Sequence, residues 1–521
     1  MESDTNYIDL ADEYQKIGNY DLAIENYHKA INKEPENAKI YNALAICYYC
    51  KKDYESAIMI YEEAVKIRPD YAMAFNNLGL IYSDIRKYDK SIENYLKAIE
   101  IYPEYATAYN NLGNIFCKMY KYAEAVDFFE KAIELKPDYA DAYSNTGIAL
   151  HSLEKYDEAI KFFEKAVELN PNNPETYNNL GNSYNEKRLF DLAIKNFLKA
   201  IELKPDFAAA YSNLSIVYLI KGDFEKGWEF YEHRFNQNLH IIYLPKFLKP
   251  KWDGKKNNGR LFVYMEQGLG DALMFARYFP VLKNMGLNLL AWVDDSLLEF
   301  FKFNFPYISF VSELKNLKED DYDFYISSMS LPFVLKTTPE TIPFSSGYLK
   351  AEPEKVKEYK EKYFNNDEFK IGINWQCKNI YPRDRFRTIP DISYLFSVAG
   401  MQGVKVYSIQ KGEGEKQLTN LPDSIEIVNL GTGFNDFSET AAAIENLDVC
   451  ITVDTSIAHL SGGLGKLTWI TIPNAADWKW FLNTDKSIWY ENAKLFRQKE
   501  HCNWKEVIDR ICNDLQSLKK K

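Results

Sequence analysis

The first half of the chain repeats itself every 34 residues, and this period constrains the fold more than any other feature. Proline marks one phase of the period, small residues mark two, and aromatic residues mark two more. The positions are Pro35, Pro69, Pro103, Pro137, Pro171 and Pro205; Ala23, Ala57, Ser91, Ala125, Ala159, Ala193 and Gly227; Ala30, Ala64, Ala98, Ala132, Ala166 and Ala200; Tyr20, Tyr54, Tyr88, Tyr122, Tyr156, Phe190 and Phe224; and Tyr27, Tyr61, Tyr95, Phe129, Phe163, Phe197 and Tyr231. Self-similarity at this spacing indicates a solenoid of stacked supersecondary units.

Each phase of the repeat has a physical reason. Small residues predict sites where two helices approach closely, aromatic residues predict fillers of the gaps between successive helix pairs, and proline ends the second helix. The pattern resembles the tetratricopeptide repeat, and we assign seven such repeats to residues 1–241. Units of this kind bury their apolar faces by stacking into a superhelix with an extended concave groove. The partner expected in that groove is another polypeptide.

Asparagine recurs on the first helix of successive repeats, which is the helix that lines the groove. One row consists of Asn77, Asn111, Asn145, Asn179 and Asn213, and a neighbouring row of Asn42, Asn76, Asn110 and Asn178, with Ser144 and Ser212 as replacements. A carboxamide both donates and accepts hydrogen bonds, so a row of them can hold an extended peptide backbone. The row resembles the asparagine ladder of the O-linked N-acetylglucosamine transferase superhelix, which implies an acceptor polypeptide. The alternative is that these amides cap or bridge adjacent repeats.

The pattern changes after Phe235. Residues 242–258, rich in Pro, Lys, Asn and Gly, indicate a linker, and strands alternate with helices beyond it. The expected strands are 260–265, 287–293, 307–311, 323–327, 369–375, 404–409, 425–429, 448–453 and 467–472, and the expected helices are 271–285, 353–364, 391–399, 437–447 and 456–462. Such alternation predicts parallel sheets, here two, which bind ligands at the carboxyl ends of their strands.

The first segment whose residues could carry out chemistry is EQGLGD, which follows the first of these strands. Gly268 and Gly270 would let the chain turn sharply there, and Asp271 falls at the start of the next helix. An aspartate so placed is a candidate general base. The alternative is a structural one, because aspartate is also a preferred N-cap residue.

The second segment opens a later helix. A strand ends at Asp454, and Thr455 and Ser456 begin a helix whose first N–H groups form a ready anion site. His459 lies four residues after Thr455 and therefore on the same helix face. The alternative for His459 is an ordinary packed or solvated histidine.

The third segment is a charged loop after another strand. It carries Lys378, Arg383, Arg385 and Arg387, and such cations could neutralise a nucleotide diphosphate. The alternative is a solvated loop that is partly self-paired, because Asp384 lies within it.

Together the three segments resemble heptosyltransferase-type glycosyltransferases of the GT-B fold, in the branch that is fused to tetratricopeptide repeats. The resemblance covers about residues 258–515 and rests on four stretches: G-x-G-D-x-L-x-F-A-R-Y at Gly268–Tyr278, D-T-S-x-A-H-L-x-G-x-x-G at Asp454–Gly465, the Trp375–Arg387 run, and the tail Ala476–Gln498. It implies that Asp271 is the general base. It also implies that Asp454, Thr455, Ser456 and His459 lie on the nucleotide-sugar side.

The fold class that follows is α + α/β, with an all-helical superhelix before a GT-B enzyme of two Rossmann-like domains. The acceptor half would span residues 259–350 and the nucleotide-sugar half 351–521. The resemblance implies a glycosyltransferase that moves a sugar from a nucleotide-sugar to a polypeptide in the groove, with inversion. No Asp-x-Asp cation clamp stands out, so neither a metal nor a cofactor is expected. Two alternatives remain: a non-catalytic scaffold with a degenerate transferase domain, and a transferase that acts on a glycan or lipid.

Net charge and composition limit the kinds of partner that the chain is expected to bind. The net charge of -12 argues against nucleic acid and anionic membrane surfaces, which favour clustered Lys and Arg. Seven scattered cysteines do not describe a disulfide framework. No stretch approaches the ~18 apolar residues of a membrane span, and the N-terminus lacks the apolar core of a signal peptide. We therefore expect a cytoplasmic protein.

Overall fold

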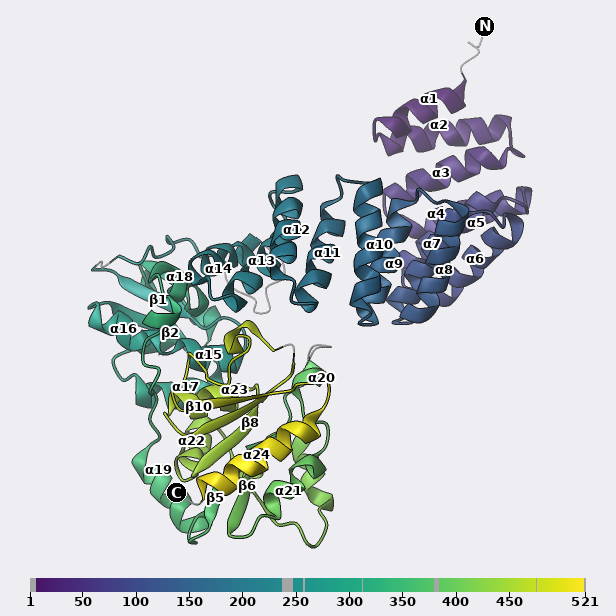
Figure 1. Ribbon diagram of the computed structural model, residues 1–521. Helices are drawn as coiled ribbons and strands as arrows, with labels where there is room; N and C mark the ends of the chain where they lie inside the picture. The colour runs from purple at the N-terminus through teal and green to yellow at the C-terminus, as the bar shows by residue number, and fades with distance from the viewer. Residues whose placement is uncertain are drawn as a thin grey trace. The chain divides into compact units, whose positions relative to one another are not determined.

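The computed structural model describes residues 6–236, 247–255, 258–311, 313–378, 384–474 and 476–519. The chain divides into two compact units, Met1–Ala210 and Tyr211–Lys521. The division falls inside the first helix of the seventh expected repeat, which spans Ala208–Ile220. Figure 1 shows helices throughout the first unit and both helices and sheets in the second.

The repeats are pairs of helices, as the 34-residue period predicts. The seven pairs are α1 (Tyr7–Lys16) and α2 (Tyr20–Lys33), α3 (Ala38–Cys50) and α4 (Tyr54–Ile67), α5 (Ala72–Asp84) and α6 (Tyr88–Ile101), α7 (Ala106–Lys118) and α8 (Tyr122–Leu135), α9 (Ala140–Ser152) and α10 (Tyr156–Leu169), α11 (Pro174–Glu186) and α12 (Phe190–Leu203), and α13 (Ala208–Ile220) and α14 (Phe224–Tyr231). Each expected proline from Pro35 to Pro205 follows the end of a second helix, where its missing N–H does no harm.

The small residues lie where the sequence predicts, at buried helix contacts, and Ala125 and Ala132 are typical of them. The aromatic phase that runs from Tyr27 to Tyr231 differs from the expectation. A Cβ built on Gly113 would lie 2.6 Å from the Phe129 ring, and the same overlap recurs in three other repeats. These rings therefore fill the space inside a helix pair, against the glycine of their own repeat, rather than a gap between successive pairs.

The turns between paired helices share a left-handed residue. It recurs every 34 residues with φ between 58° and 81°, at Gly18, Lys52, Arg86, Tyr120, Glu154, Arg188 and Gly222. Five of these seven residues carry a side chain, and the left-handed conformation costs such residues roughly 1–2 kcal/mol. The turn is thus imposed by the packing of the helices and not by local preference.

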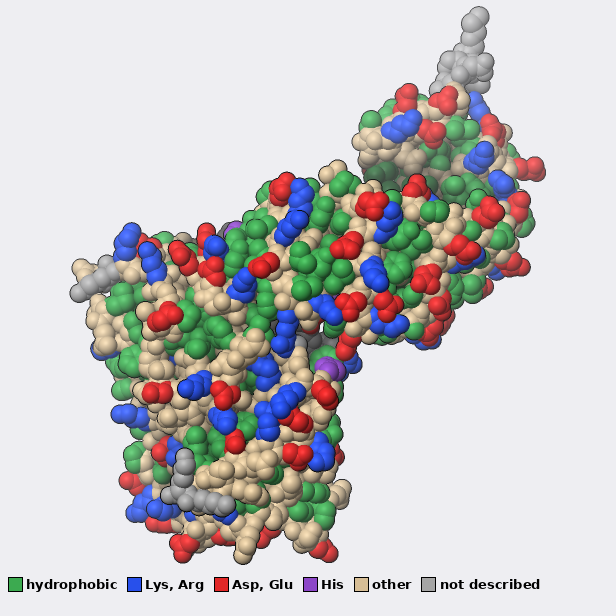
Figure 2. All heavy atoms as spheres, viewed as in Figure 1, with side chains coloured by type: hydrophobic (Ala, Val, Ile, Leu, Met, Phe, Trp, Pro, Cys, Tyr) green, Lys and Arg blue, Asp and Glu red, His purple; other side chains and the backbone are tan. Residues whose placement is uncertain are grey.

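Charged side chains of both signs are interspersed over the face of the repeats in Figure 2. Several form exposed pairs one helical turn apart, such as Lys29 with Glu25 and Lys131 with Glu134. Exposed pairs of this kind contribute at most about 1 kcal/mol each. The first unit is therefore stabilised chiefly by the buried alanines, glycines and aromatic rings.

The second unit contains two sheets, and every strand pairing within its described residues is parallel. The strand orders are β3-β2-β1-β4 and β10-β9-β8-β5-β6-β7. The strands are β1 (Arg260–Tyr264), β2 (Asn288–Trp292), β3 (Ser309–Val311), β4 (Phe324–Ser327), β5 (Phe369–Asn374), β6 (Val404–Ser408), β7 (Ile427–Asn429), β8 (Val449–Val453), β9 (Thr468–Ile472) and β10 (Ala493–Arg497). The prediction of two parallel sheets is confirmed, and β10 is the strand that the sequence did not suggest.

The strand orders locate the ligand-binding edge of each sheet. Counted from β5, the larger sheet runs 3-2-1-4-5-6, the order of doubly wound nucleotide-binding sheets. Its order reverses between β5 and β8, and that of the smaller sheet reverses between β1 and β4. Ligands of such sheets bind at the carboxyl ends of the strands beside the reversal. The segments of interest in this unit are therefore those that follow β1, β4, β5 and β8.

Helices occupy all five expected positions in the second unit, and four further helices among its described residues, two of them ten residues or longer, were not expected. The helices with α geometry are α15 (Leu269–Phe275), α16 (Tyr278–Asn284), α17 (Asp295–Asn304), α18 (Leu331–Val334), α19 (Pro353–Tyr363), α20 (Asp384–Arg387), α21 (Phe396–Ala399), α22 (Phe437–Glu445), α23 (Ser456–Gly463) and α24 (Trp504–Leu518). The single helix expected over 271–285 is broken between α15 and α16. No helix in the described parts of the chain is long and apolar enough to cross a membrane.

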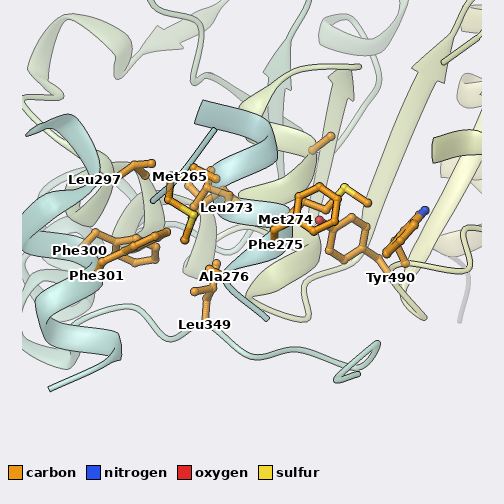
Figure 3. Packing of buried hydrophobic residues seen from close by; sticks show 14 of the residues in the cluster. Met265, Leu273, Met274, Phe275, Ala276, Leu297, Phe300, Phe301, Leu349 and Tyr490 are labelled. Carbon is orange, nitrogen blue, oxygen red and sulfur yellow. The ribbon is translucent and has the colours of Figure 1, made fainter. Parts of the chain in front are cut away.

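The core of the second unit includes the last helix of the seventh pair. Figure 3 shows part of this core, with Leu273, Met274 and Phe275 of α15 among the packed side chains. Trp228 of α14 packs edge-on against Trp478, with ring centroids 5.3 Å apart. Because its neighbours Phe224 and Tyr231 belong to the same cluster, α14 is an integral part of this unit.

Candidate functional site

The structure brings the first two sequence segments together. Gly270 of α15 lies against α23, and a Cβ built on it would lie 3.0 Å from Cδ2 of His459 and 3.6 Å from Cα of Ser456. Glycine suits this close approach because a side chain would be tight against the buried His459 ring. As a result, Asp271, from the segment after β1, and the helix start after β8 belong to one site.

The turn before α15 differs from the expectation that two glycines make it possible. Gln267 is the residue in the left-handed conformation, with φ of 66°, whereas Gly268 has φ of -84°. Gly268 is the N-cap of α15, and a Cβ built on it would meet no atom within 4 Å. Asp271 lies three residues beyond this cap, so it does not play the structural N-cap role that was its alternative.

Asp271 is poorly solvated and paired with one lysine. Its side chain is 16% exposed, and its Oδ1 lies 3.4 Å from Nζ of Lys479. Burial raises the pKa of the Asp271 carboxyl above its ordinary value, and Lys479 opposes this rise. A carboxylate with a raised pKa is better suited to accept a proton at neutral pH than an exposed one.

Lys479 is the functional candidate that the sequence did not single out. Burial alone would lower the pKa of its ammonium group, but the carboxylates of Asp271, Asp477 and Asp454 raise it above the ordinary value. Its Nζ also lies 3.2 Å from Oδ1 of Asp477. It belongs to the 3₁₀ turn η9 (Trp478–Trp480), whose two buried tryptophans hold the backbone on either side of the lysine. The available signal was its position in the Ala476–Gln498 tail.

Asp454 lies at the carboxyl end of β8 and is 6% exposed. Burial raises the pKa of its carboxyl, and the positive charges of Lys479 and Arg387 oppose that effect. Arg387 donates from Nη1 to the backbone oxygen of Asp454 at 2.9 Å and forms an ion pair with Asp384 at 2.9 Å. Two cations therefore lie near Asp454, the residue before the N-cap of α23.

The start of α23 offers backbone donors rather than hydroxyl groups. Thr455 is its N-cap but makes no side-chain cap hydrogen bond. Its hydroxyl instead donates to Oδ1 of Asn374 at 2.9 Å, as does that of Thr452 at 3.1 Å. Asn374 ends β5, so these bonds tie together the two strands at the order reversal. The N–H group of Ala458 donates to the backbone oxygen of Thr455 at 3.0 Å, whereas those of Ser456 and Ile457 have no backbone acceptor among the described residues and could bind an anion.

His459 is packed between aromatic rings and is 3% exposed. One ring nitrogen, Nδ1, is hydrogen-bonded to the Tyr490 hydroxyl at 2.9 Å, and Trp480 stacks on the imidazole at a centroid distance of 5.5 Å. Burial lowers the pKa of His459 well below its ordinary value, and the nearby cations Lys479 and Arg277 act in the same direction. The site therefore contains a neutral imidazole at physiological pH.

Among the described residues of the charged loop after β5, Arg387 is a predicted cation with a hydrogen bond to the site. Arg387 contacts Asp454 as described, whereas Lys378 is exposed and forms no ion pair with any described residue. Arg385 is also exposed and lies over the Phe386 ring at 4.6 Å. Arg383 lies outside the described residues. Of the three described cations predicted for a diphosphate, Arg387 is the one that contacts the residues before α23.

The turn before α15, the helix that carries Asp271, is anchored to the end of the seventh helix pair. Arg234 pairs with Glu266 through Nε at 2.9 Å and Nη2 at 2.8 Å, and the Ser327 hydroxyl donates to the same carboxylate. The side chain of Gln267 donates to the Tyr231 hydroxyl at 2.8 Å. These bonds join α14, the ends of β1 and β4, and the turn before α15.

The asparagine rows of the first unit bond to each other between repeats. The Nδ2 atoms of Asn77, Asn111 and Asn145 donate to Oδ1 of Asn42, Asn76 and Asn110 at 3.2, 3.1 and 2.9 Å. The bridging alternative is therefore present in the structure. The carboxamide oxygens of Asn111 and Asn145 make no hydrogen bond within the described residues, so both could still accept from a peptide. The role of these two, and of Asn77, Asn179 and Asn213, in peptide binding stays a prediction.

Metal ligation finds no support in the described ranges, where no group of three or more His, Cys, Asp or Glu side chains is placed to hold an ion. The acidic cluster of Asp271, Asp454 and Asp477 surrounds a lysine ammonium instead. In this cluster the negative charge of the carboxylates is neutralised by the ammonium group of a lysine side chain.

Comparisons with known proteins agree with the repeat assignment. A tetratricopeptide repeat model matches residues 3–70, 36–104, 70–138 and 104–172, and a second model of the repeat matches residues 174–207. Residues 3–207 are tetratricopeptide repeats. The seventh helix pair, α13 and α14, lies beyond the matched residues.

Relatives are more distant over the chain as a whole. The curated protein FlbA of Caulobacter vibrioides is 23% identical over 333 residues, which cover 58% of this chain and 54% of FlbA. The chain thus spans about half the length of this relative. Among solved structures, YrrB, a tetratricopeptide repeat protein with an unusual peptide-binding site, is 25% identical over 35% of this chain and 95% of its own, with a TM-score of 0.30. MamA is 31% identical over 32% of this chain and 96% of its own, also with a TM-score of 0.30.

Proposed function

We propose that the second unit is a glycosyltransferase that takes a sugar from a nucleotide-sugar, and that the repeats hold the acceptor polypeptide. The observation that carries this proposal is the contact between α15 and α23. It joins a poorly solvated carboxylate, Asp271, to an uncapped helix start flanked by Arg387 and Lys479. A proton acceptor beside an anion site is what sugar transfer from a diphosphate needs.

The reaction can be written with these groups. Asp271 takes the proton of the acceptor hydroxyl while the hydroxyl oxygen bonds to the anomeric carbon. The bond from that carbon to the diphosphate oxygen breaks, and its electron pair stays on the diphosphate. The first-turn N–H groups of α23, together with Arg387, stabilise the charge that develops there. Attack from the face opposite the leaving group inverts the anomeric centre, and these protein groups suffice without a metal ion.

Nucleotide-sugar binding and hydrolysis test the donor half of the proposal. Thermal shift against a panel of uridine, guanosine, adenosine and cytidine diphosphate sugars should give stabilisation by one nucleotide class, because a ligand that binds only the folded state raises its melting temperature. Slow release of nucleoside diphosphate from that donor should follow. Stabilisation without any release would favour the scaffold alternative, and no stabilisation by any donor would refute the proposed site.

Two matched variants test the base. Asp271→Asn should lower turnover by about 10²–10⁴-fold, the usual contribution of a general base, while nucleotide affinity stays within a few-fold. Asp320→Asn removes an exposed carboxylate elsewhere in the same unit and should leave both unchanged. Full turnover by the Asp271 variant with normal nucleotide binding would show that another group takes the proton.

The nature of the acceptor is tested separately. The extended surfaces of repeat solenoids bind other polypeptides, and residues 3–207 are such repeats. Mass spectrometry of proteins co-expressed with the active chain, and with the Asp271→Asn variant as control, should find a sugar on a bound polypeptide with the active chain alone. Sugar found on a glycan or lipid, with none on protein, would keep the enzyme and refute the polypeptide acceptor.

A further inference from the structure

Lys479 lies near both the proposed base and the proposed diphosphate site. Its Nζ is 3.4 Å from Oδ1 of Asp271, the proposed base, and it also faces Asp454, which directly precedes the proposed anion site at α23. Its side chain is 12% exposed, and the buried Trp478 and Trp480 hold the backbone around it. One poorly exposed ammonium group therefore interacts with several carboxylates.

The surroundings of Asp271 make this pairing unusual. The charged and titratable groups that face it are Lys479 of η9, Asp477 directly before η9, Glu266 after β1, and Tyr231 of α14, while His459 of α23 lies beside the adjacent Gly270. Glu266 is engaged by Arg234, and Tyr231 is a buried hydroxyl. Among the described residues, Lys479 is thus the cation that pairs with Asp271.

We propose that Lys479 is a positioning residue that leaves Asp271 for the diphosphate of the donor, so that donor binding turns Asp271 into a stronger base. The inference rests on the proposed function, because it needs a diphosphate at the start of α23. A diphosphate carries more charge than a single carboxylate and would compete for the ammonium group. The base would then be poised for proton transfer once the donor is in place.

The physical consequence is a change in the proton affinity of Asp271. An opposite charge at this range lowers a carboxyl pKa, so its withdrawal raises the pKa of the Asp271 carboxyl while the desolvation of that group remains. In the absence of acceptor, Asp271 would take up a proton from solvent when the diphosphate binds. During turnover the same carboxylate takes the proton of the acceptor hydroxyl, and no other reactant is required.

Calorimetry of the full chain measures this proton uptake directly. The probes are uridine, guanosine, adenosine and cytidine diphosphate, each titrated at several mildly acidic pH values in two buffers that differ in ionisation enthalpy. The dependence of the heat on the buffer gives the protons bound per nucleotide. Asp271→Asn serves as the reference, because subtracting its value removes the protons exchanged by the nucleotide phosphate itself.

The expected result is an uptake by the unmodified chain that exceeds that of Asp271→Asn by a fraction of one proton. In Lys479→Gln this excess should vanish, because Asp271 already lacks its cation before the nucleotide arrives. Lys357→Gln, which removes an exposed lysine on α19, should keep the excess. Nucleotide binding without any excess over Asp271→Asn would overturn this inference and leave the proposed function standing. Failure of all four nucleotides to bind would overturn both.

Discussion

Replacing Asn111 and Asn145 together by alanine separates the two roles that an asparagine row can play in a repeat solenoid. Each side chain reaches back to the preceding repeat, where its Nδ2 donates to the carboxamide oxygen of Asn76 or Asn110. Those two acceptors are each 5% exposed. The double variant therefore removes two inter-repeat hydrogen bonds and leaves two buried oxygens without these donors.

The magnitude follows from burial and geometry. A buried acceptor that loses its partner costs about 1–3 kcal/mol, and the half-buried position of the donors lets water reach part of the space that they vacate. We therefore take the lower part of the range and expect a loss of about 2–3 kcal/mol for the pair. Asn110 and Asn111 are neighbours on α7, so strict additivity is not assumed. A repeat unit of this size would melt about 5–10 °C lower.

The distribution of tryptophan makes the measurement specific. All nine tryptophans lie at Trp228 or later, so their fluorescence reports the second unit, whereas far-ultraviolet circular dichroism is dominated by the helices of the repeats. Chemical denaturation followed by both signals should show an earlier dichroism transition and an unchanged fluorescence transition. The matched control is Asn94→Ala, because the exposed Asn94 amide bonds only to the backbone of its own helix. This control should move neither transition by more than about 0.5 kcal/mol.

A different outcome would refute the reasoning. If the double variant unfolded at the same denaturant concentration as the unmodified chain, the inter-repeat bonds would contribute nothing to stability. The remaining role of the asparagines would then be ligand binding. If it lost stability but bound acceptor polypeptide with unchanged affinity, the row would be structural, and the predicted peptide contact would be wrong.

The remaining predictions concern the turns and the second unit. At the left-handed position of Arg86, Arg86→Gly should be about 0.5–1 kcal/mol more stable than Arg86→Ala in the dichroism transition, because glycine tolerates the conformation. Burial lowers the pKa of His459 in the folded state below its unfolded value of about 6.5. His459 therefore contributes stability above that unfolded pKa, and this stability is lost as the pH falls below it. His459→Gln should reduce the loss of fluorescence-monitored stability between neutral and mildly acidic pH. Glu266→Gln leaves the buried Arg234 with weaker partners and should cost about 3 kcal/mol in the fluorescence transition, whereas replacement of the exposed Glu313 by glutamine should cost almost nothing.

The repeats could be predicted from the sequence because each phase reports a local contact. Alanine at Ala125 and proline at Pro137 follow directly from close helix approach and helix termination. The location of the Phe129 ring could not be predicted in the same way. It depends on which face of the pair the ring meets, and the empty space over Gly113 that receives it is visible only in three dimensions.

The positions of the candidate site residues could be predicted where the residue follows a strand, and not where it comes from an irregular turn. Asp271 and Asp454 follow β1 and β8, so their place at the carboxyl ends of the strands could be anticipated. Lys479 comes from a short turn between β9 and β10, and its approach to Asp271 depends on the packing of two tryptophans against the core. Among the cations of the charged loop, local sequence cannot tell that Arg387 faces Asp454 whereas Lys378 faces solvent.

The second unit depends on the helix that the repeat period assigns to the first half of the chain. Trp228 and Phe224 are almost completely buried in its core, and each such side chain contributes about 1.5–3 kcal/mol by burial. Arg234 adds the pairing with Glu266, and Tyr231 holds the strained Gln267 before α15. These contributions together approach the ~5–15 kcal/mol by which a domain is stable. A fragment that begins at residue 211 should therefore keep the fluorescence transition of the full chain, whereas one that begins at residue 242 should unfold at much lower denaturant concentration or fail to fold. Equal stability of the two fragments would show that α14 is dispensable and that the loop bearing Asp271 is positioned by the sheets alone.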